Sequence, residues 1–187
     1  MDLDLYNHTY DCFSELLAGG QGHILDIGCG PGNITRYLLH KRPELHITGL
    51  DVAPAMLELA QHYNPKACFL QMDCRDLRTL KQRYMGIVCG FCIPYLSQED
   101  IRVLLQDCER LLTDGGCLYI SFVAGDYEAS GYTTGSSGLS IFFYYHSPEY
   151  IRSELLQNGF LLVQQYEILY QRTEHTSEVH TVWICQK

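Results

Sequence analysis

The sequence predicts an α/β fold in which helices cover both faces of a mostly parallel sheet. Five short apolar segments alternate with segments of helical spacing, which is the pattern of parallel strands joined by crossover helices. The first apolar segment also runs directly into a glycine-rich turn and a helix, over residues 23–42. Because a chain of 187 residues buries about 70% of its unfolded surface, residues 1–187 are predicted to form one domain.

The first part of the chain is predicted to form one helix followed by alternating strands and helices. Residues 1–22 supply the first helix, which Gly19 and Gly20 are expected to end. The helix at 97–113 has the clearest signals, because Ser97 and Asp100 approximate a capping box and Gly115-Gly116 is expected to stop it. The predicted strands lie at 23–28, 45–51, 67–73, 85–91 and 116–124, and the other helices at 32–42, 54–64 and 76–82.

The segment 125–146 is the least regular part of the sequence. It contains several glycines, a Ser/Thr run and many aromatic residues. A connection of this length is usually functional or disordered, and disorder is expected for residues 133–138. A helix is then predicted to begin at Ser147-Pro148 and to end at Asn158-Gly159. Two strands, at 160–163 and 179–185, are predicted to follow, with a polar turn at 171–177 between them.

The turn after the first strand indicates the kind of ligand that this edge of the sheet binds. Its glycines are Gly28, Gly30 and Gly32, and Asn33 stands where a dinucleotide-binding motif would have its third glycine. Pro31 removes a backbone N–H that a phosphate cradle would use. Asp26 places a carboxylate near the strand end, where the ammonium group of a ligand can reach it. The turn therefore favours a ligand with an amino-acid end over a pyrophosphate.

The run Asp26-Ile27-Gly28-Cys29-Gly30-Pro31-Gly32 resembles, residue for residue, the first motif of the class I S-adenosylmethionine-dependent methyltransferases. Asp51 and Asp73, at the ends of the next two predicted strands, also match the spacing of this family. The resemblance implies a Rossmann-like, three-layer α/β/α fold with a mostly parallel seven-stranded sheet and an antiparallel C-terminal strand. It also implies S-adenosylmethionine as the cofactor and S-adenosylhomocysteine as the product.

The resemblance further implies which residues contact the cofactor. In the family, the position of Asp51 binds the ribose hydroxyls, and the positions of Asp73 and Cys74 face the adenine. Tyr6 or Tyr10 is expected to reach the cofactor carboxylate, although both tyrosines can equally pack on the sheet. The full predicted cofactor set is Asp26, Gly28, Cys29, Gly30, Gly32, Asp51, Val52, Met56, Asp73, Cys74, Phe91 and Tyr10.

In similar proteins the connection after the fifth strand helps to form the substrate pocket, so residues 125–146 are interpreted as a mobile lid with aromatic anchors. His146 is the candidate general base, because the ordinary pKa of histidine suits proton transfer near neutral pH. A histidine beside two tyrosines can also serve as a cap or a packing residue. The predicted substrate-binding residues are Tyr95, Tyr127, Tyr132, Tyr144 and Tyr145.

Composition limits the partners. A net charge of −9 disfavours nucleic acid, because phosphate neutralisation needs a basic face. The basic residues between 75 and 83 are interpreted as a solvated helix face. Nine cysteines without a disulfide pattern suggest reduced thiols and the cytoplasm, and the start of the chain does not resemble a signal peptide. The longest uncharged run, 84–98, is too short to cross a membrane.

The cysteine pair Cys89-x-x-Cys92 is interpreted as structural, since two further metal ligands are not nearby in the sequence. Three functions remain open. The leading one is methyl transfer to a small-molecule substrate. A protein or nucleic-acid methyltransferase would instead need an open groove after Gly125, and a cofactor-binding protein without transferase activity would lack an acceptor site. A nicotinamide enzyme is disfavoured by Asn33. The sequence does not predict the oligomeric state.

Overall fold

A computed structural model describes residues 4–17, 19, 21–134, 140–173 and 176–187. Its centre is a seven-stranded sheet in the order β3-β2-β1-β4-β5-β9-β8. β9 runs antiparallel to both of its neighbours, β5 and β8, and all other neighbouring strands are parallel. The predicted mostly parallel sheet with an antiparallel C-terminal strand is therefore confirmed. The strands are β1 (His23–Ile27), β2 (His46–Asp51), β3 (Cys68–Gln71), β4 (Tyr84–Cys89), β5 (Leu112–Val123), β8 (Leu161–Thr173) and β9 (Thr176–Gln186).

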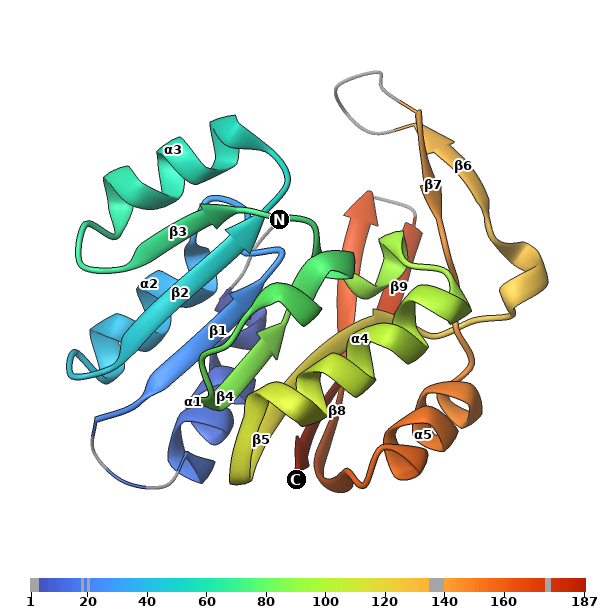
Figure 1. Ribbon diagram of the computed structural model, residues 1–187. Coiled ribbons are helices and arrows are strands. Elements are labelled where there is room, and N and C mark those ends of the chain that lie inside the picture. Colours follow the sequence, from blue (N-terminus) through green and yellow to red (C-terminus); the bar gives the residue numbers. More distant parts are fainter. Residues whose placement is uncertain (1–3, 18, 20, 135–139, 174–175) are drawn as a thin grey trace.

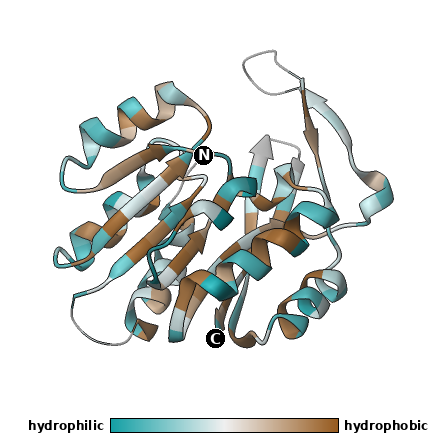
Figure 2. Cartoon of the chain, viewed as in Figure 1, coloured by the Kyte–Doolittle hydropathy of each residue, from teal (hydrophilic) through white to brown (hydrophobic). Residues whose placement is uncertain are grey.

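Helices cover both faces of this sheet, as the alternating pattern predicts. The first core cluster joins one face of the sheet to α4 (Gln98–Leu111) and α5 (Pro148–Gln157). The second joins the opposite face to the short helix η1 (Asp4–Tyr6), α1 (Asn7–Leu16) and α2 (Asn33–Lys41). The helix α3 (Pro54–Tyr63) lies beside β2 and β3 (Figure 1). Apolar residues run along the central strands and the inner helix faces (Figure 2).

The helix α4 shows how local sequence positions an element. Ser97 accepts a hydrogen bond from the Asp100 backbone, and the Asp100 side chain accepts one from the Ser97 backbone, so the predicted capping box is present. The predicted stop at Gly115-Gly116 is wrong. The helix ends at Leu111, and β5 begins immediately at Leu112. Leu112 is fully buried and pairs with Tyr84 of β4. Gly115 and Gly116 therefore lie inside β5, in a stretch where its register with β4 is irregular.

Two other segments differ from the expectation. The predicted helix at 76–82 is a short 3₁₀ helix, η2 (Cys74–Thr79), whose only buried residue is Leu77. A segment with so little apolar surface gains too little from packing to support a full α-helix. At the C-terminus, Ser147 caps α5 as predicted. The polar turn expected at 171–177 lies mostly within β8 and β9, apart from residues 174–175, which are outside the described residues.

The segment 125–146 is more regular than predicted. It contains the one-turn helix η4 (Tyr127–Ala129) and the strands β6 (Gly131–Thr134) and β7 (Ser140–Phe143), which pair as a separate antiparallel sheet. This β6–β7 hairpin stands beyond the strand ends of the main sheet (Figure 1). Of the expected disordered stretch, Thr133 and Thr134 belong to β6, and 135–138 lie outside the described residues. Tyr132 and Phe142 are paired across the two strands, and their rings are in edge-to-face contact, which stabilises the hairpin.

Among the described helices, none has the length and apolar character needed to cross a membrane. All nine cysteines carry free thiols.

Candidate functional site

A pocket of about 310 Å³ lies at the carboxyl ends of β1, β2 and β4, where open α/β sheets place their ligands. We call it the strand-end pocket. One part of its wall comes from the turns after the strands, and another from the 3₁₀ helices η2 and η3 (Ile93–Tyr95) and from β7. Its lining residues are Gly28, Asp51, Val52, Met72, Asp73, Cys74, Arg75, Phe91, Cys92, Tyr95, Leu96 and Ile141.

The glycine turn is built from backbone conformations that side chains disfavour. Gly28, Gly30 and Gly32 have φ values of 66°, 53° and 77°, all in the left-handed region that glycine adopts freely. At Gly28 there is also no room, because a Cβ would lie 2.9 Å from the Cβ of Cys92. The turn therefore requires glycine at position 28 for both conformational and steric reasons.

Asp51, at the end of β2, is fixed by backbone donors. Its Oδ2 accepts a hydrogen bond from the Gly30 N–H at 2.8 Å, and its Oδ1 accepts one from the Ala53 N–H at 2.9 Å. An ionised carboxylate has about four acceptor positions, so both oxygens can still accept from a ligand. The arrangement joins the glycine turn to β2 and presents a carboxylate that can receive hydroxyl groups.

A second acidic group lies at the end of β3. Asp73 caps η2 by accepting from the Arg75 backbone at 2.9 Å. The Arg75 guanidinium pairs with Asp73 at 3.1 Å and with Asp100 at 3.0 Å. Burial raises the pKa of the neighbouring Cys74 thiol, which keeps that thiol protonated. Sequence reasoning interpreted Arg75 as part of a solvated face, although it lines the pocket.

Phe91 occupies a strained position between β4 and η3. It is the only non-glycine residue among the described ones with a positive φ, at 65°, a conformation that bulky residues rarely adopt. Its N–H donates to Ser121 Oγ at 2.9 Å. Its ring meets the Tyr6 ring edge-to-face, with centroids 4.9 Å apart. These contacts hold Phe91 in the wall of the pocket.

Asp26 does not line this pocket. It is 1% exposed, and its Oδ2 accepts a hydrogen bond from Thr35 Oγ1 at 2.7 Å. Burial raises its pKa to about 6, because a low-dielectric environment disfavours the charged form. Contact between Asp26 and a ligand ammonium group stays a prediction.

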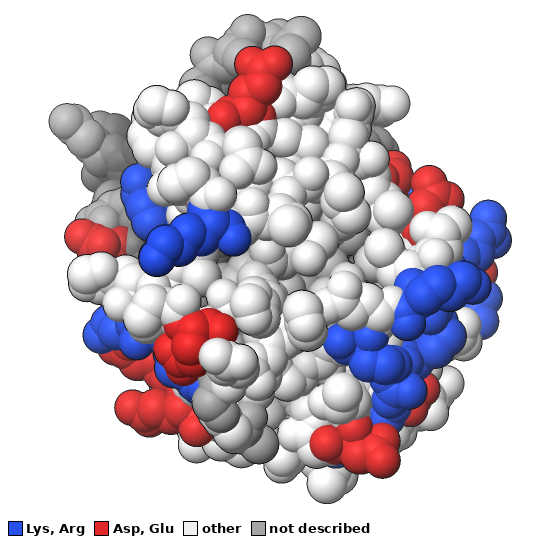
Figure 3. Space-filling view, turned by 60° about the vertical axis from the view of Figure 1, so that its left-hand side comes forward, with Lys and Arg blue, Asp and Glu red and all other residues white. Residues whose placement is uncertain are grey.

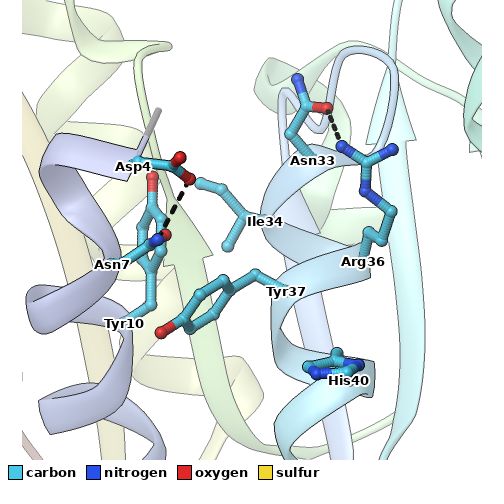
Figure 4. A pocket seen from close by; sticks show the side chains of 8 residues that line it. All are labelled: Asp4, Asn7, Tyr10, Asn33, Ile34, Arg36, Tyr37 and His40. Carbon is cyan, nitrogen blue, oxygen red and sulfur yellow. Dashed lines mark hydrogen bonds between the residues drawn. The ribbon is translucent and has the colours of Figure 1, made fainter. Parts of the chain in front are cut away.

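A second pocket, of about 330 Å³, lies between α1 and α2 and is lined in part by Tyr10. We call it the α1–α2 pocket. Figure 4 shows its lining side chains, among which the Asp4–Asn7 and Asn33–Arg36 pairs are hydrogen-bonded. Tyr10 is 2% exposed, and its hydroxyl has no hydrogen-bond partner within the described part of the chain. The lining residues are Asp4, Asn7, Tyr10, Asn33, Ile34, Arg36, Tyr37 and His40.

The structure thus brings part of the predicted site together. The predicted residues that line the strand-end pocket are Gly28, Asp51, Val52, Asp73, Cys74, Phe91 and Tyr95. Those outside its lining are Asp26, Cys29, Gly30, Gly32, Met56 and Tyr10, together with Tyr127, Tyr132, Tyr144, Tyr145 and His146. The pocket residues that stand in neither the predicted cofactor set nor the predicted substrate set are Met72, Arg75, Cys92, Leu96 and Ile141. For Arg75, the signal was its position two residues after Asp73 at a strand end.

His146 lies at the base of the β6–β7 hairpin. It is fully buried, and its Nε2 lies 3.0 Å from the Leu96 carbonyl oxygen. Burial lowers its pKa, so the ring is neutral at pH 7. Its Nδ1 has no partner within the described residues. The structure therefore places His146 behind Leu96, and its role as a base stays a prediction.

Comparison with known proteins agrees with the geometry of the site. Residues 24–116 match a family described as a methyltransferase domain. Trans-aconitate 2-methyltransferase of Methylobacterium nodulans is 31% identical over 110 residues, which are 59% of this chain and 42% of that protein. Demethylmenaquinone methyltransferase of Thermotoga maritima is 34% identical over 97 residues, 52% of this chain and 42% of that protein. The chain therefore spans less than half the length of these curated relatives.

Solved structures share the fold. A S-adenosylmethionine-dependent methyltransferase from Methanosarcina mazei has a TM-score of 0.78 at 16% identity, over 92% of this chain and 95% of that one. Magnesium protoporphyrin IX methyltransferase from Synechocystis, with bound S-adenosylmethionine, has a TM-score of 0.71 at 18% identity, over 98% and 80%. The strand order, the glycine turn and these matches lead to one conclusion: the chain belongs to the class I S-adenosylmethionine-dependent methyltransferase family.

Proposed function

We propose that the protein transfers the methyl group of S-adenosylmethionine to a small-molecule acceptor by in-line displacement. The observation that carries this proposal is the position of Asp51. Two backbone N–H groups hold its carboxylate at the wall of the strand-end pocket, and its remaining acceptor positions suit the two hydroxyls of a ribose. The residues present fit the cofactor, because nothing lies within 4 Å of the position that a Cβ would take at Gly30, so the glycine turn has open space on that side.

When bound, the cofactor supplies an electrophilic methyl group on a sulfonium. The chain then has to bind, orient and exclude water. Asp51 would bind the ribose, and Asp73 with Cys74 would face the adenine. Phe91 and Cys92 would enclose the sulfonium end, since they follow β4 beside the glycine turn. Tyr10 lines the α1–α2 pocket, and its buried hydroxyl, which has no described hydrogen-bond partner, is the proposed contact for the cofactor carboxylate.

A small acceptor is supported by the size and the cover of the site. The strand-end pocket measures about 310 Å³, and the β6–β7 hairpin contributes Ile141 to its wall. Because the bound cofactor takes part of this volume, the space that is left for an acceptor suits a small molecule. The names of two curated relatives specify trans-aconitate and demethylmenaquinone, both of them small molecules.

His146 is the proposed base if the acceptor is a hydroxyl that must lose a proton. In that case kcat should fall as the pH decreases through a pKa below the usual 6.5, because burial lowers the pKa of this ring. His146→Ala should then reduce kcat by about 100-fold or more. Full turnover by this variant on an identified acceptor would remove the role and leave His146 as a packing residue.

Two alternatives remain. A macromolecular acceptor is disfavoured by the net charge of −9. In the view of Figure 3, Lys and Arg form separate groups beside acidic residues rather than one continuous surface. A cofactor-binding protein without transferase activity would bind S-adenosylmethionine and methylate none of a broad set of acceptors.

The first test is calorimetric titration with S-adenosylmethionine, S-adenosylhomocysteine and NAD. We expect micromolar binding of the first two and its loss in Asp51→Ala. Asp114→Ala is the matched control, because Asp114 is fully exposed on the surface and should leave affinity unchanged. Binding of NAD alone would overturn the proposal.

A further inference from the structure

The two parts of the strand-end pocket differ in charge. The part formed by the ends of β2 and β3 contains Asp51, Asp73 and Arg75. The part formed after β4 and by the hairpin contains no charged residue among those described. It is lined by Phe91, Cys92, Tyr95, Leu96 and Ile141. The Arg75 guanidinium borders this second part, because its Nη2 donates to the Tyr95 carbonyl oxygen at 3.4 Å. A ligand group that enters the second part meets no other positively charged side chain among the described pocket residues.

Each charged group of the first part already has a partner in the protein, although the Asp51 oxygens keep acceptor positions for a ligand. Both Asp51 oxygens accept backbone hydrogen bonds. The Arg75 guanidinium, the only Lys or Arg side chain among the described pocket residues, pairs with Asp73 and Asp100. A carboxylate-bearing acceptor would have to compete with these two aspartates for Arg75. A cationic acceptor would find no carboxylate in the apolar part. Transfer of an unpaired charge from water into the apolar part is unfavourable in either case.

The hairpin adds an apolar wall to this part of the pocket. Alternation along β7 puts Ile141 and Phe143 on one face and Phe142 on the other. Ile141 lines the pocket, and the Phe143 ring meets the Tyr95 ring edge-to-face with centroids 6.2 Å apart. Phe142 instead packs on Tyr132, with ring centroids 5.2 Å apart. The Tyr144 N–H donates to the Pro94 carbonyl at 2.7 Å, which holds the face of β7 that carries Ile141 and Phe143 against η3.

From this charge distribution and wall we infer that the acceptor is a neutral apolar molecule, bound between Tyr95 and Ile141, and not a carboxylate. The inference rests on the proposed function, because it assigns the charged part of the pocket to the nucleoside of the cofactor. It also implies that the acceptor of this chain differs from the trans-aconitate in the names of its relatives. Ile141, from the hairpin, is then a specificity-determining residue.

The test uses three probes that share a naphthalene ring and differ in charge at pH 7: 2-naphthol, 2-naphthoate and 2-naphthylmethylammonium. Each is titrated calorimetrically into the unmodified protein saturated with S-adenosylhomocysteine, and trans-aconitate is titrated in parallel. We expect 2-naphthol to bind at least about tenfold more tightly than either ion and trans-aconitate to show no binding. Equal or tighter binding of any charged probe, or no binding of 2-naphthol, overturns the inference.

Two variants on one strand test the wall itself. Ile141→Ser should weaken 2-naphthol binding by about five- to tenfold, because it removes an apolar contact surface. Phe142→Ser, which alters the other face of the same strand, should change the affinity by less than about twofold. Equal losses in both variants would contradict the assignment. Melting curves and the affinity for S-adenosylhomocysteine show whether each variant is folded. If a variant does not fold, the ranking of the three probes in the unmodified protein still tests the inference.

The outcomes keep the two proposals apart. Failure of S-adenosylhomocysteine to bind would refute the proposed function. Binding of S-adenosylhomocysteine together with a preference for a charged probe would refute only the acceptor class.

Discussion

The Tyr6 hydroxyl lies 2.5 Å from Nδ1 of His180, although the two residues are 174 positions apart in the chain. Both side chains are buried. Nε2 of His180 faces the Glu178 carboxylate at 3.7 Å. Because a carboxylate accepts hydrogen bonds, the geometry assigns the ring proton to Nε2, which leaves Nδ1 to accept from Tyr6. This bond ties the N-terminal segment to β9, behind Phe91.

Tyr6→Phe should therefore destabilise the protein by about 1–3 kcal/mol, because it leaves a buried histidine nitrogen unpaired. This difference in the free energy of unfolding between the two proteins should become smaller at acidic pH. Burial lowers the pKa of His180 in the fold from its usual 6.5, so the stability that its neutral form contributes is present above pH 6.5 and is lost as the pH falls through the folded pKa. Urea unfolding of both proteins between pH 5 and 8 measures the difference. A gap that is constant across this range would contradict the assignment.

Gly28→Ala should be more damaging than Gly30→Ala. Both positions have positive φ, which costs an alanine about 1–2 kcal/mol. Only at Gly28 would the new Cβ meet another side chain, at 2.9 Å from Cys92, whereas nothing lies within 4 Å at Gly30. We expect an additional loss of about 1–3 kcal/mol in the free energy of unfolding for Gly28→Ala. Equal losses would show that backbone conformation alone requires these glycines.

Asp26→Asn should alter the pH dependence of stability. The folded pKa of Asp26 is about 6, above its usual 3.8, so the stability of the protonated form is fully present below pH 3.8 and is lost as the pH rises through 6. The loss amounts to about 3 kcal/mol, at about 1.4 kcal/mol per pH unit. As the pH rises from 4 to 7, the free energy of unfolding of Asp26→Asn should therefore increase by about this amount relative to that of the unmodified protein. A constant offset between the two proteins would mean that the carboxylate is not destabilised by burial.

Tyr10→Phe should separate binding from stability. The Tyr10 hydroxyl has no described partner, so its removal should leave the melting temperature unchanged or slightly higher. Affinity for S-adenosylhomocysteine should fall by about tenfold if this hydroxyl contacts the cofactor carboxylate. Tyr6→Phe provides the contrast, because the hydroxyl of Tyr6 is already bonded to His180. Unchanged affinity in both variants would remove the tyrosine contact from the proposed site.

The strand-end residues could be predicted because they depend on local sequence. Gly28, Asp51 and Asp73 each follow an apolar run, and parallel strands bring such ends to one edge. The fold class follows from the same alternation of strands and helices. These predictions needed no knowledge of distant contacts.

The remaining pocket residues depend on packing between segments that are far apart in the sequence. Ile141 reaches the pocket only because the hairpin folds back onto η3, held by the Tyr144–Pro94 hydrogen bond. Arginine is usually a solvated residue, and Arg75 is fixed at the site by its ion pairs with Asp73 and with Asp100, which lies on another helix. The helix stop expected at Gly115 was wrong because burial of Leu112 against β4 outweighs the local glycine signal.

The hairpin begins and ends at one place. Ala124 pairs with His146, and the Gly125 N–H donates to the His146 carbonyl at 3.2 Å. A segment whose two ends already touch can be lengthened, shortened or exchanged without moving the strands on either side of it. During evolution, such a junction allows the segment beside the proposed acceptor site to be replaced while the residues proposed to bind the cofactor stay in place. Grafting the corresponding segment of a related enzyme between these two residues offers the same route in the laboratory.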